Sequence, residues 1–134
     1  MIVLDTSFLV AFHNSRDIHH AAARPLMNEL VAGKWGRALL LEYVFLEVTT
    51  VLLVRRNLNL ASSVASILLQ AREVDFAPCS ELFIDTLETF RNQAGTELSF
   101  ADAAIITAAR RYNAAGIATF DREFDKLKGI TVVP

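Results

Sequence analysis

Ile2-Val3-Leu4-Asp5 and Gly116-Ile117-Ala118-Thr119-Phe120-Asp121 are short apolar runs at opposite ends of the chain, and each ends on an aspartate. Their lack of polar alternation is typical of strands that are buried on both faces of a parallel sheet. In an open parallel sheet the carboxyl ends of the strands form the ligand-binding crevice. Two carboxylates about 4 Å apart there repel each other by roughly 4 kcal/mol at an effective dielectric constant of ~20. Such a pair therefore indicates a cation, a substrate or a shared proton between them.

The chain between these two runs alternates between strand-like and helix-like segments. We expect strands at 2–4, 37–41, 74–77, 117–120 and 130–133, and helices at 6–12, 17–31, 43–56, 61–72, 80–92 and 99–112. Pro25 should kink the second helix or mark a second start within it. Strands separated by helices predict an α/β fold, here a three-layer α/β/α sandwich around a mostly parallel five-stranded sheet. No linker or repeat interrupts the pattern, so we expect one domain over 1–134.

Composition narrows the class of protein. The 134 residues are 53% hydrophobic and 21% charged, which is typical of a globular chain. The net charge of −2 does not indicate a nucleic-acid-binding protein, although a local basic patch could still bind nucleic acid. Cys79 is the single cysteine, which excludes an internal disulfide and a cysteine-based zinc site. No apolar run is long enough for a bilayer, and Asp5 interrupts the first one without a preceding basic region. We therefore expect a cytoplasmic protein without a membrane partner.

Four of the 15 acidic residues lie where a core is expected. Asp5 and Asp121 end apolar strands, Glu47 follows Val44-Phe45-Leu46, and Asp102 precedes Ala103-Ala104-Ile105-Ile106. An ionised carboxylate in such a place is costly unless it is paired or binds a metal. Both helical acids fall near the start of their helices, at the sheet edge where the strands end, so all four can converge. A carboxylate set without histidine or cysteine suits Mg²⁺ or Mn²⁺.

Each acid also has a simpler explanation. Ser99-Phe100-Ala101-Asp102 resembles a capping box, with Asp in place of the usual Glu. Asp5 could cap the following helix, Asp121 could open a turn, and Glu47 could lie on a solvated helix face. Each explanation is reasonable for one residue. Four such coincidences in one chain are a weaker explanation than one shared site.

The four acids and their neighbours resemble the PIN-domain family, and in particular its short VapC-type toxin nucleases. The matching segments are Leu4–Ser7, Leu41–Glu47, Leu98–Ala103 and Ala118–Phe124, in this order. The resemblance covers essentially the whole chain, and it implies a PIN-like fold and a metal-dependent endoribonuclease that uses Mg²⁺ or Mn²⁺. The family's four acids carry over onto Asp5, Glu47, Asp102 and Asp121.

The same resemblance implies further residues and partners. Thr6, Ser7 and Ser99 would be hydroxyls that orient carboxylates or waters. RNA would be the substrate, and a second copy of the chain and a small VapB-like antitoxin would be the protein partners. The apolar stretches Val51–Val54 and Ile67–Leu69 are either core or an exposed patch for one of those partners. A PIN-like RNA-binding or RNA-processing module that is not a toxin remains the alternative.

Two other classes of protein place acids at strand ends. A phosphoacceptor domain needs an adjacent acidic pair after the first strand and a lysine after a later one, but Leu4 precedes Asp5 and no lysine ends the 117–120 strand. A phosphohydrolase with Asp5 as nucleophile needs a second acid two residues later, where this chain has Ser7. Neither pattern is present.

Overall fold

A computed structural model describes all residues from 1 to 134. In chain order its elements are β1 (Ile2–Leu4), α1 (Thr6–His13), α2 (His20–Val31), β2 (Ala38–Leu41), α3 (Glu42–Arg55), α4 (Leu58–Gln70), β3 (Val74–Ala77), η1 (Ser80–Leu82), α5 (Phe83–Arg91), α6 (Phe100–Arg111), β4 (Gly116–Ala118), η2 (Arg122–Lys126) and β5 (Val132–Val133). The five strands form one sheet in the order β3-β2-β1-β4-β5, and every neighbouring pair is parallel. The predicted α/β class is confirmed, and the sheet is parallel throughout.

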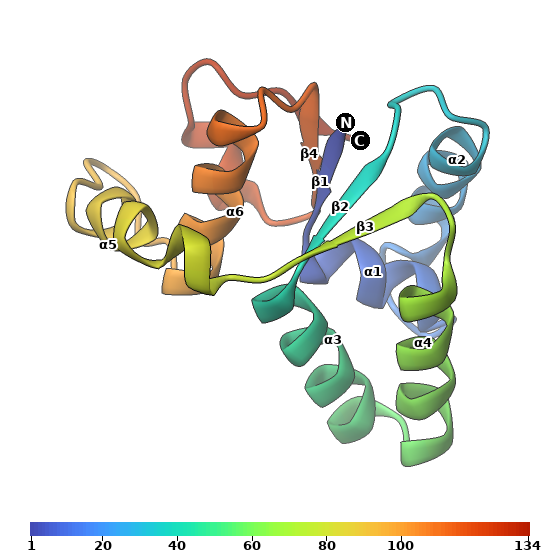
Figure 1. The fold of residues 1–134 in the computed structure, drawn as a ribbon. Coiled ribbons are helices and arrows are strands. Elements are labelled where there is room, and N and C mark those ends of the chain that lie inside the picture. Colours follow the sequence, from blue (N-terminus) through green and yellow to red (C-terminus); the bar gives the residue numbers. More distant parts are fainter.

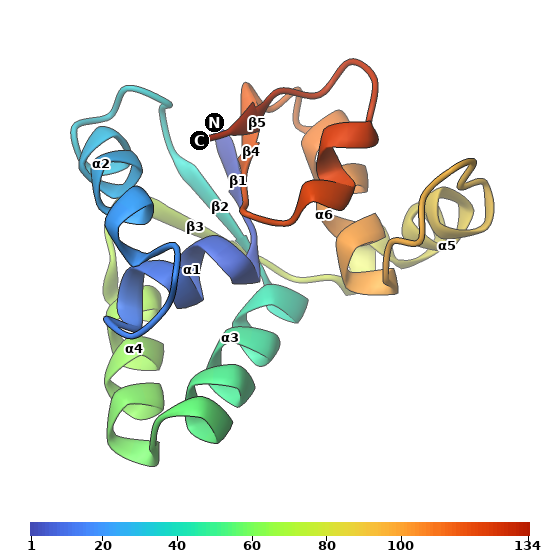
Figure 2. The ribbon, with the colours of Figure 1, turned by 180° about the vertical axis from the view of Figure 1, so that it is seen from behind.

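Strand β1 lies at the centre of the sheet. Ile2 pairs with Ala38 of β2 on one side and with Gly116 of β4 on the other. Helices α1 to α4 form one covering layer, and α5 and α6 form the other (Figures 1 and 2). Ile2 and Val3 are fully buried, because helices cover both faces of the central strand. Asp5 follows β1 directly, so its carboxylate lies where the buried central strand ends.

Several boundaries differ from the sequence-based prediction. The helix predicted over 61–72 is α4, Leu58–Gln70, and only Val132–Val133 of the strand predicted over 130–133 forms β5. The second helix begins at His20 instead of Asp17, because the Asp17 carboxylate accepts the His19 backbone N–H (2.8 Å) in a turn before the helix. Pro25 lies inside α2 without marking a second start. The helix predicted over 80–92 is divided into the 3₁₀ turn η1 and the helix α5.

One cluster of 32 buried hydrophobic residues forms the core. The two apolar stretches, Val51–Val54 and Ile67–Leu69, each contribute to the core and to the surface. Leu52 and Leu68 are buried, while the neighbouring side chains are exposed: Leu53, Val54, Ile67 and Leu69. The exposed side chains lie on α3 and α4, which pack against each other. Despite these apolar surfaces, none of the helices combines the length and the apolar character that crossing a membrane requires.

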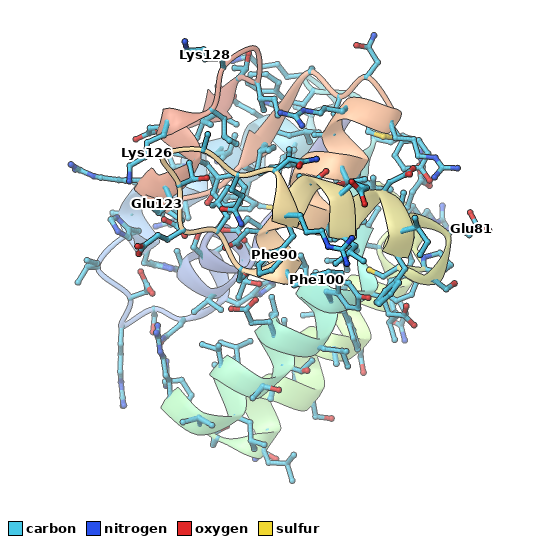
Figure 3. The ribbon with its side chains drawn as sticks, turned by 90° about the vertical axis from the view of Figure 1, so that its left-hand side faces the viewer. Glu81, Phe90, Phe100, Glu123, Lys126 and Lys128 are labelled. Carbon is cyan, nitrogen blue, oxygen red and sulfur yellow. The ribbon has the colours of Figure 1, made fainter.

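Aromatic packing fixes the start of α6 against its neighbours. The ring of Phe100 lies 6.1 Å from Tyr43 of α3, 5.5 Å from Phe83 and 5.7 Å from Phe90 of α5, centroid to centroid. Figure 3 shows Phe90 and Phe100 side by side at the junction of α5 and α6. Rings at such distances and tilts are favourable contacts. They hold the first turn of α6, which carries Asp102, beside the first turns of α3.

Candidate active site

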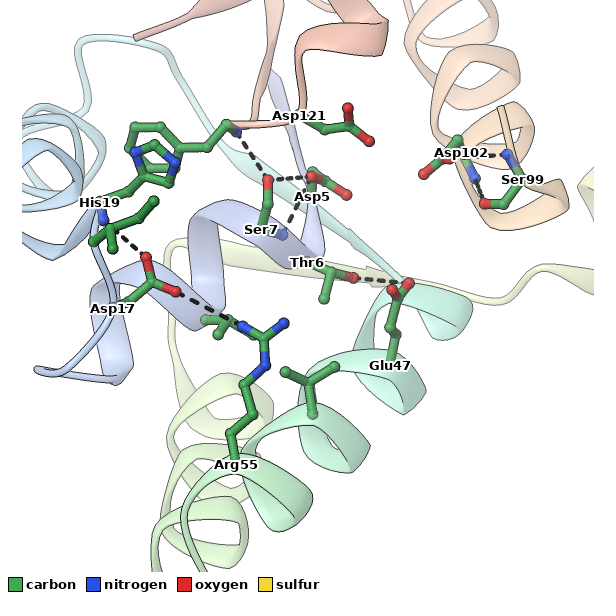
Figure 4. Close-up of a pocket in the computed structure, with 14 residues that line it drawn as sticks. Asp5, Thr6, Ser7, Asp17, His19, Glu47, Arg55, Ser99, Asp102 and Asp121 are labelled. Carbon is green, nitrogen blue, oxygen red and sulfur yellow. Dashed lines mark hydrogen bonds and ion pairs between the residues drawn. The ribbon is translucent and has the colours of Figure 1, made fainter. Parts of the chain in front are cut away.

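A pocket of about 550 Å³ opens where β1 and β4 end. Side chains from the segment after β1, from α3, from the start of α6 and from the segment after β4 line it (Figure 4). The four acids selected from the sequence are all among them: Asp5, Glu47, Asp102 and Asp121. The three predicted hydroxyl residues, Thr6, Ser7 and Ser99, line it as well. The pocket thus brings together residues that are up to 116 positions apart, from Asp5 to Asp121.

One side of the pocket, here called the strand wall, consists of Asp5, Ser7 and Thr119 at the ends of β1 and β4. Asp5 is only 5% exposed, and its Oδ2 accepts three hydrogen bonds: from the Ser7 N–H (3.2 Å), the Ser7 hydroxyl (2.5 Å) and the Thr119 hydroxyl (2.7 Å). The Ser7 hydroxyl in turn accepts the Phe120 N–H (2.8 Å), and that of Thr119 accepts the Asp121 N–H (3.0 Å). These bonds hold the Asp5 carboxylate in one orientation.

The opposite side, here called the helix wall, carries Glu47 on α3 and Asp102 on α6. Glu47 Oε2 accepts one hydrogen bond, from the Thr6 hydroxyl (3.1 Å). Asp102 and Ser99 form the predicted capping box: Asp102 Oδ2 accepts the Ser99 N–H (2.9 Å), and the Ser99 hydroxyl accepts the Asp102 N–H (3.1 Å). The Glu47 carboxylate therefore accepts one hydrogen bond and the Asp102 carboxylate one, whereas the Asp5 carboxylate accepts three.

The capping contacts leave half of each carboxylate unused. Asp5 accepts the Ser7 N–H as N-cap of α1, and Asp121 Oδ1 accepts the Glu123 N–H (2.9 Å) at the start of η2, so the simpler explanations are correct as local descriptions. Yet every one of these bonds, on all four acids, goes to a single oxygen of the carboxylate. The second oxygen accepts no hydrogen bond from the protein. A cap and a ligand are therefore compatible roles for the same side chain.

The acids of the helix wall are electrostatically strained. Burial raises the pKa of Asp102 above its ordinary value; the bonds from Ser99 oppose the rise, and the negative charges of Asp5 and Asp121 add to it. Burial likewise raises the pKa of Glu47, the bond from Thr6 opposes it, and Asp5 and Asp102 add to it. Both groups are disfavoured as anions, which is the condition that a bound cation relieves.

The donor set fits a hard divalent cation in its chemistry. All four free donors are carboxylate oxygens, which Mg²⁺ and Mn²⁺ prefer. The four acids line the pocket but do not converge on one point. No three histidine, cysteine, aspartate or glutamate side chains lie close enough together to hold a metal ion. The free oxygens would therefore have to turn inward on binding, which the lightly bonded helix wall permits.

Three residues of the pocket were missed or misjudged from the sequence. Asp17, where the second helix was predicted to begin, has a side chain that is only 13% exposed and lines the pocket. Arg55 near the end of α3 also lines it, together with His19. Arg55 lies eight residues after Glu47, a spacing that places both near one face of the helix. That spacing was available as a signal, whereas the approach of Asp17 and His19 was not.

The PIN domain family model matches residues 2–130 of this chain. Among solved structures, a similar one is the Mycobacterium tuberculosis toxin VapC20, described as cleaving the Sarcin-Ricin loop, with a TM-score of 0.86 and 27% identity over 100% of both chains. A toxin–antitoxin complex from Klebsiella pneumoniae matches with a TM-score of 0.68 and 13% identity, covering 98% of this chain and 96% of that one. FitAcB from Neisseria gonorrhoeae matches with a TM-score of 0.66 and 15% identity, covering 100% and 97%. No curated protein is similar enough in sequence to count as a match.

Proposed function

Because the chain belongs to the PIN domain family, we propose that it is a metal-dependent endoribonuclease and the toxin of a toxin–antitoxin pair. The observation that carries the proposal is the pocket in which four carboxylates from four separate segments each keep one free oxygen. The similarity to VapC20 over the full chain supports RNA as the substrate class.

In this proposal Asp5, Glu47, Asp102 and Asp121 hold Mg²⁺ or Mn²⁺. The bound ion supplies an activated water and neutralises charge that develops on the phosphodiester. Ser7 keeps Asp5 oriented, Thr6 does the same for Glu47, and Ser99 for Asp102. Glu47 lies on the pocket wall, and partial desolvation of its carboxyl group raises its pKa, so it is suited to accept a proton from the attacking water.

Cleavage of RNA tests this proposal directly. The purified protein should cut RNA in Mg²⁺ or Mn²⁺ and stop in excess chelator, because every proposed ligand is a carboxylate oxygen. Equal cutting with and without chelator, by a preparation that the Asp5→Asn variant shows to be free of contaminating nuclease, would contradict it. The cytoplasm, where RNA and metal are both available, is the proposed site of action.

The partners in the proposal are a small antitoxin and a second copy of this chain. The exposed apolar side chains of Leu53 and Val54 on α3, with Ile67 and Leu69 on α4, provide a surface that burial would stabilise. A structural neighbour that is a toxin–antitoxin complex supports the antitoxin. Light scattering at micromolar concentration should return about twice the 14.8 kDa chain mass for a dimer. A clean monomer would leave this surface to the antitoxin alone.

An RNA-processing nuclease that is not a toxin is the second candidate, since the same pocket would serve it. Expression in a bacterial host distinguishes the two. A toxin should arrest growth, and co-expression of the protein encoded by a short adjacent reading frame should restore it. Normal growth with demonstrable nuclease activity would favour RNA processing.

A further inference from the structure

The pocket is strongly acidic except at one point. Five acids line it, because Asp17 joins the four already described, while Arg55 is its single arginine or lysine. An RNA strand is a polyanion, so most of this surface repels it. Arg55 is the one residue of the pocket that attracts a phosphate at close range.

Arg55 is available for such a contact. Its side chain is 60% exposed, and its nearest acidic partner is Asp17, with 3.9 Å between Nη1 and Oδ2. That distance is too long for a charge-assisted hydrogen bond, and the guanidinium makes no hydrogen bond within the chain. Its planar donors therefore remain free to grip a phosphate. Asp17 holds the guanidinium near the pocket without occupying it.

A stacked aromatic pair lines the same pocket as Arg55. The His19 ring is parallel to that of Phe120, with centroids 4.5 Å apart and an angle of 4° between the planes. The Phe120 backbone N–H bonds to the Ser7 hydroxyl, which bonds to Asp5, so the pair is tied to the strand wall. His19 remains exposed although Phe120 covers one face of it. An open flat ring is therefore presented next to the acids.

Asp17 joins these two features. Its Oδ1 accepts the His19 N–H (2.8 Å), and its Oδ2 faces the guanidinium of Arg55. Figure 4 shows His19, Asp17 and Arg55 in succession along one edge of the pocket, with Asp5 and Glu47 beside them. A cation and an open ring at one edge correspond to the two recognisable parts of a nucleotide, its phosphate and its base.

We propose that Arg55 and the His19–Phe120 pair form a nucleotide subsite, which holds the RNA nucleotide adjacent to the cleaved phosphodiester. Arg55 binds its phosphate, and the exposed face of His19 stacks on its base. Stacking of this kind accepts any base, so the subsite contributes affinity and strand position more than sequence choice. This inference rests on the proposed nuclease function and names how that site holds its substrate.

The experiment measures RNA binding at a series of salt concentrations. The signal is the fluorescence anisotropy of a short, labelled, single-stranded RNA of mixed sequence. All proteins carry Asp102→Asn so that the strand is not cut. Arg55→Gln should weaken binding and reduce the slope of log K against log salt by about 0.7, the value for one lost phosphate contact on a single strand. Arg55→Lys keeps the charge and should restore the slope. At about pH 8, His19→Ala should weaken binding roughly fivefold or more at every salt concentration, and His19→Phe should restore it.

Arg91→Gln is the matched control. Arg91 is 63% exposed and has one distant acidic partner, Glu88 at 3.5 Å, but it lies on α5 outside the pocket. If Arg55→Gln and His19→Ala both bind RNA as Arg91→Gln does, the subsite is wrong and the nuclease proposal stands. If the parent protein binds no RNA at all, the subsite and the nuclease proposal both fail. Equal melting temperatures of the variants confirm that the differences arise from binding.

Discussion

The strand wall and the helix wall hold carboxylates of the same chemical type in opposite ways. Asp5 on the strand wall is buried and accepts three hydrogen bonds, whereas Glu47 on the helix wall is exposed and accepts one. The first arrangement fixes a group before any ligand arrives. The second leaves groups free to turn, and the raised pKa values of Glu47 and Asp102 show that their charge is not satisfied by the protein. A site divided in this way combines a fixed reference point with a side that a cation can draw inward.

The largest effect should follow from removing the fixed charge. Asp5→Asn should reduce RNA cleavage by at least ~100-fold, because losing an outer partner of a metal ligand already costs ~10–100-fold and Asp5 is a proposed ligand. Initial rates on a single RNA substrate in Mg²⁺ provide the measurement. Asp85→Asn is the control, since Asp85 is exposed on α5 and pairs only with Arg111. Similar rates for both variants would remove Asp5 from the site.

The second effect tests whether a cation draws the helix wall inward. Mg²⁺ or Mn²⁺ at about 100 times its dissociation constant should stabilise the wild-type protein by about 2.7 kcal/mol through mass action. Asp102→Asn should gain less from the metal, because it lacks one ligand charge. Thermal melting with and without metal measures both. Melting curves that metal leaves unchanged would contradict the four-carboxylate site.

A third comparison makes the same chemical change on each wall. Ser7→Ala removes bonds to both Asp5 and the Phe120 N–H and should cost about 1–3 kcal/mol, because buried polar groups lose their partners. Ser99→Ala removes an exposed N-cap and should cost about 1 kcal/mol. Urea unfolding gives both values. A larger cost for Ser99→Ala would reverse the assignment of fixed and adaptable walls.

The smallest effect is a pH dependence of stability without metal. The folded-state pKa of Asp102 lies above its ordinary value of 3.8, and that of Glu47 above 4.5, so the folded protein binds more protons than the unfolded chain in the windows that open at those values. The contribution of these two groups to stability is therefore complete at low pH and is lost as the pH rises through their folded-state values.

Removing the charge of Asp102 or of Glu47 should weaken this pH dependence of stability. Asp102→Asn keeps a carbonyl oxygen for the Ser99 N–H, so without metal it should melt higher than wild type near neutral pH. Glu47→Gln should act in the same direction, and Asp85→Asn should keep the wild-type dependence. If Asp102→Asn instead melts lower, with a loss of stability of the ~1 kcal/mol expected for a lost cap, capping is the main role of Asp102.

The sequence predicted much of this architecture because its signals are local. Unbroken apolar runs such as Ile2–Leu4 and Leu39–Leu41 identify buried strands, and the helical segments between them require parallel connections. The predicted helix boundaries were less accurate where a side chain forms a hydrogen bond with the backbone. The Asp17 carboxylate accepts the His19 N–H, and α2 therefore begins after this turn. The four acids were identifiable because each stands among apolar neighbours, a contradiction visible without any structure.

The sequence by itself therefore determined the fold class and the four acids, since burial pattern and charge are written along the chain. Tertiary structure decided how those acids are held. Only the packing of β4 against β1 brings Thr119 to Asp5, and only the path of the chain before α2 brings Asp17 to Arg55 and His19 into the same pocket. It also decided that each capping carboxylate keeps one free oxygen, because which oxygen is used depends on the direction of its donors in space. Such contacts join residues up to 114 positions apart, and no local pattern records them.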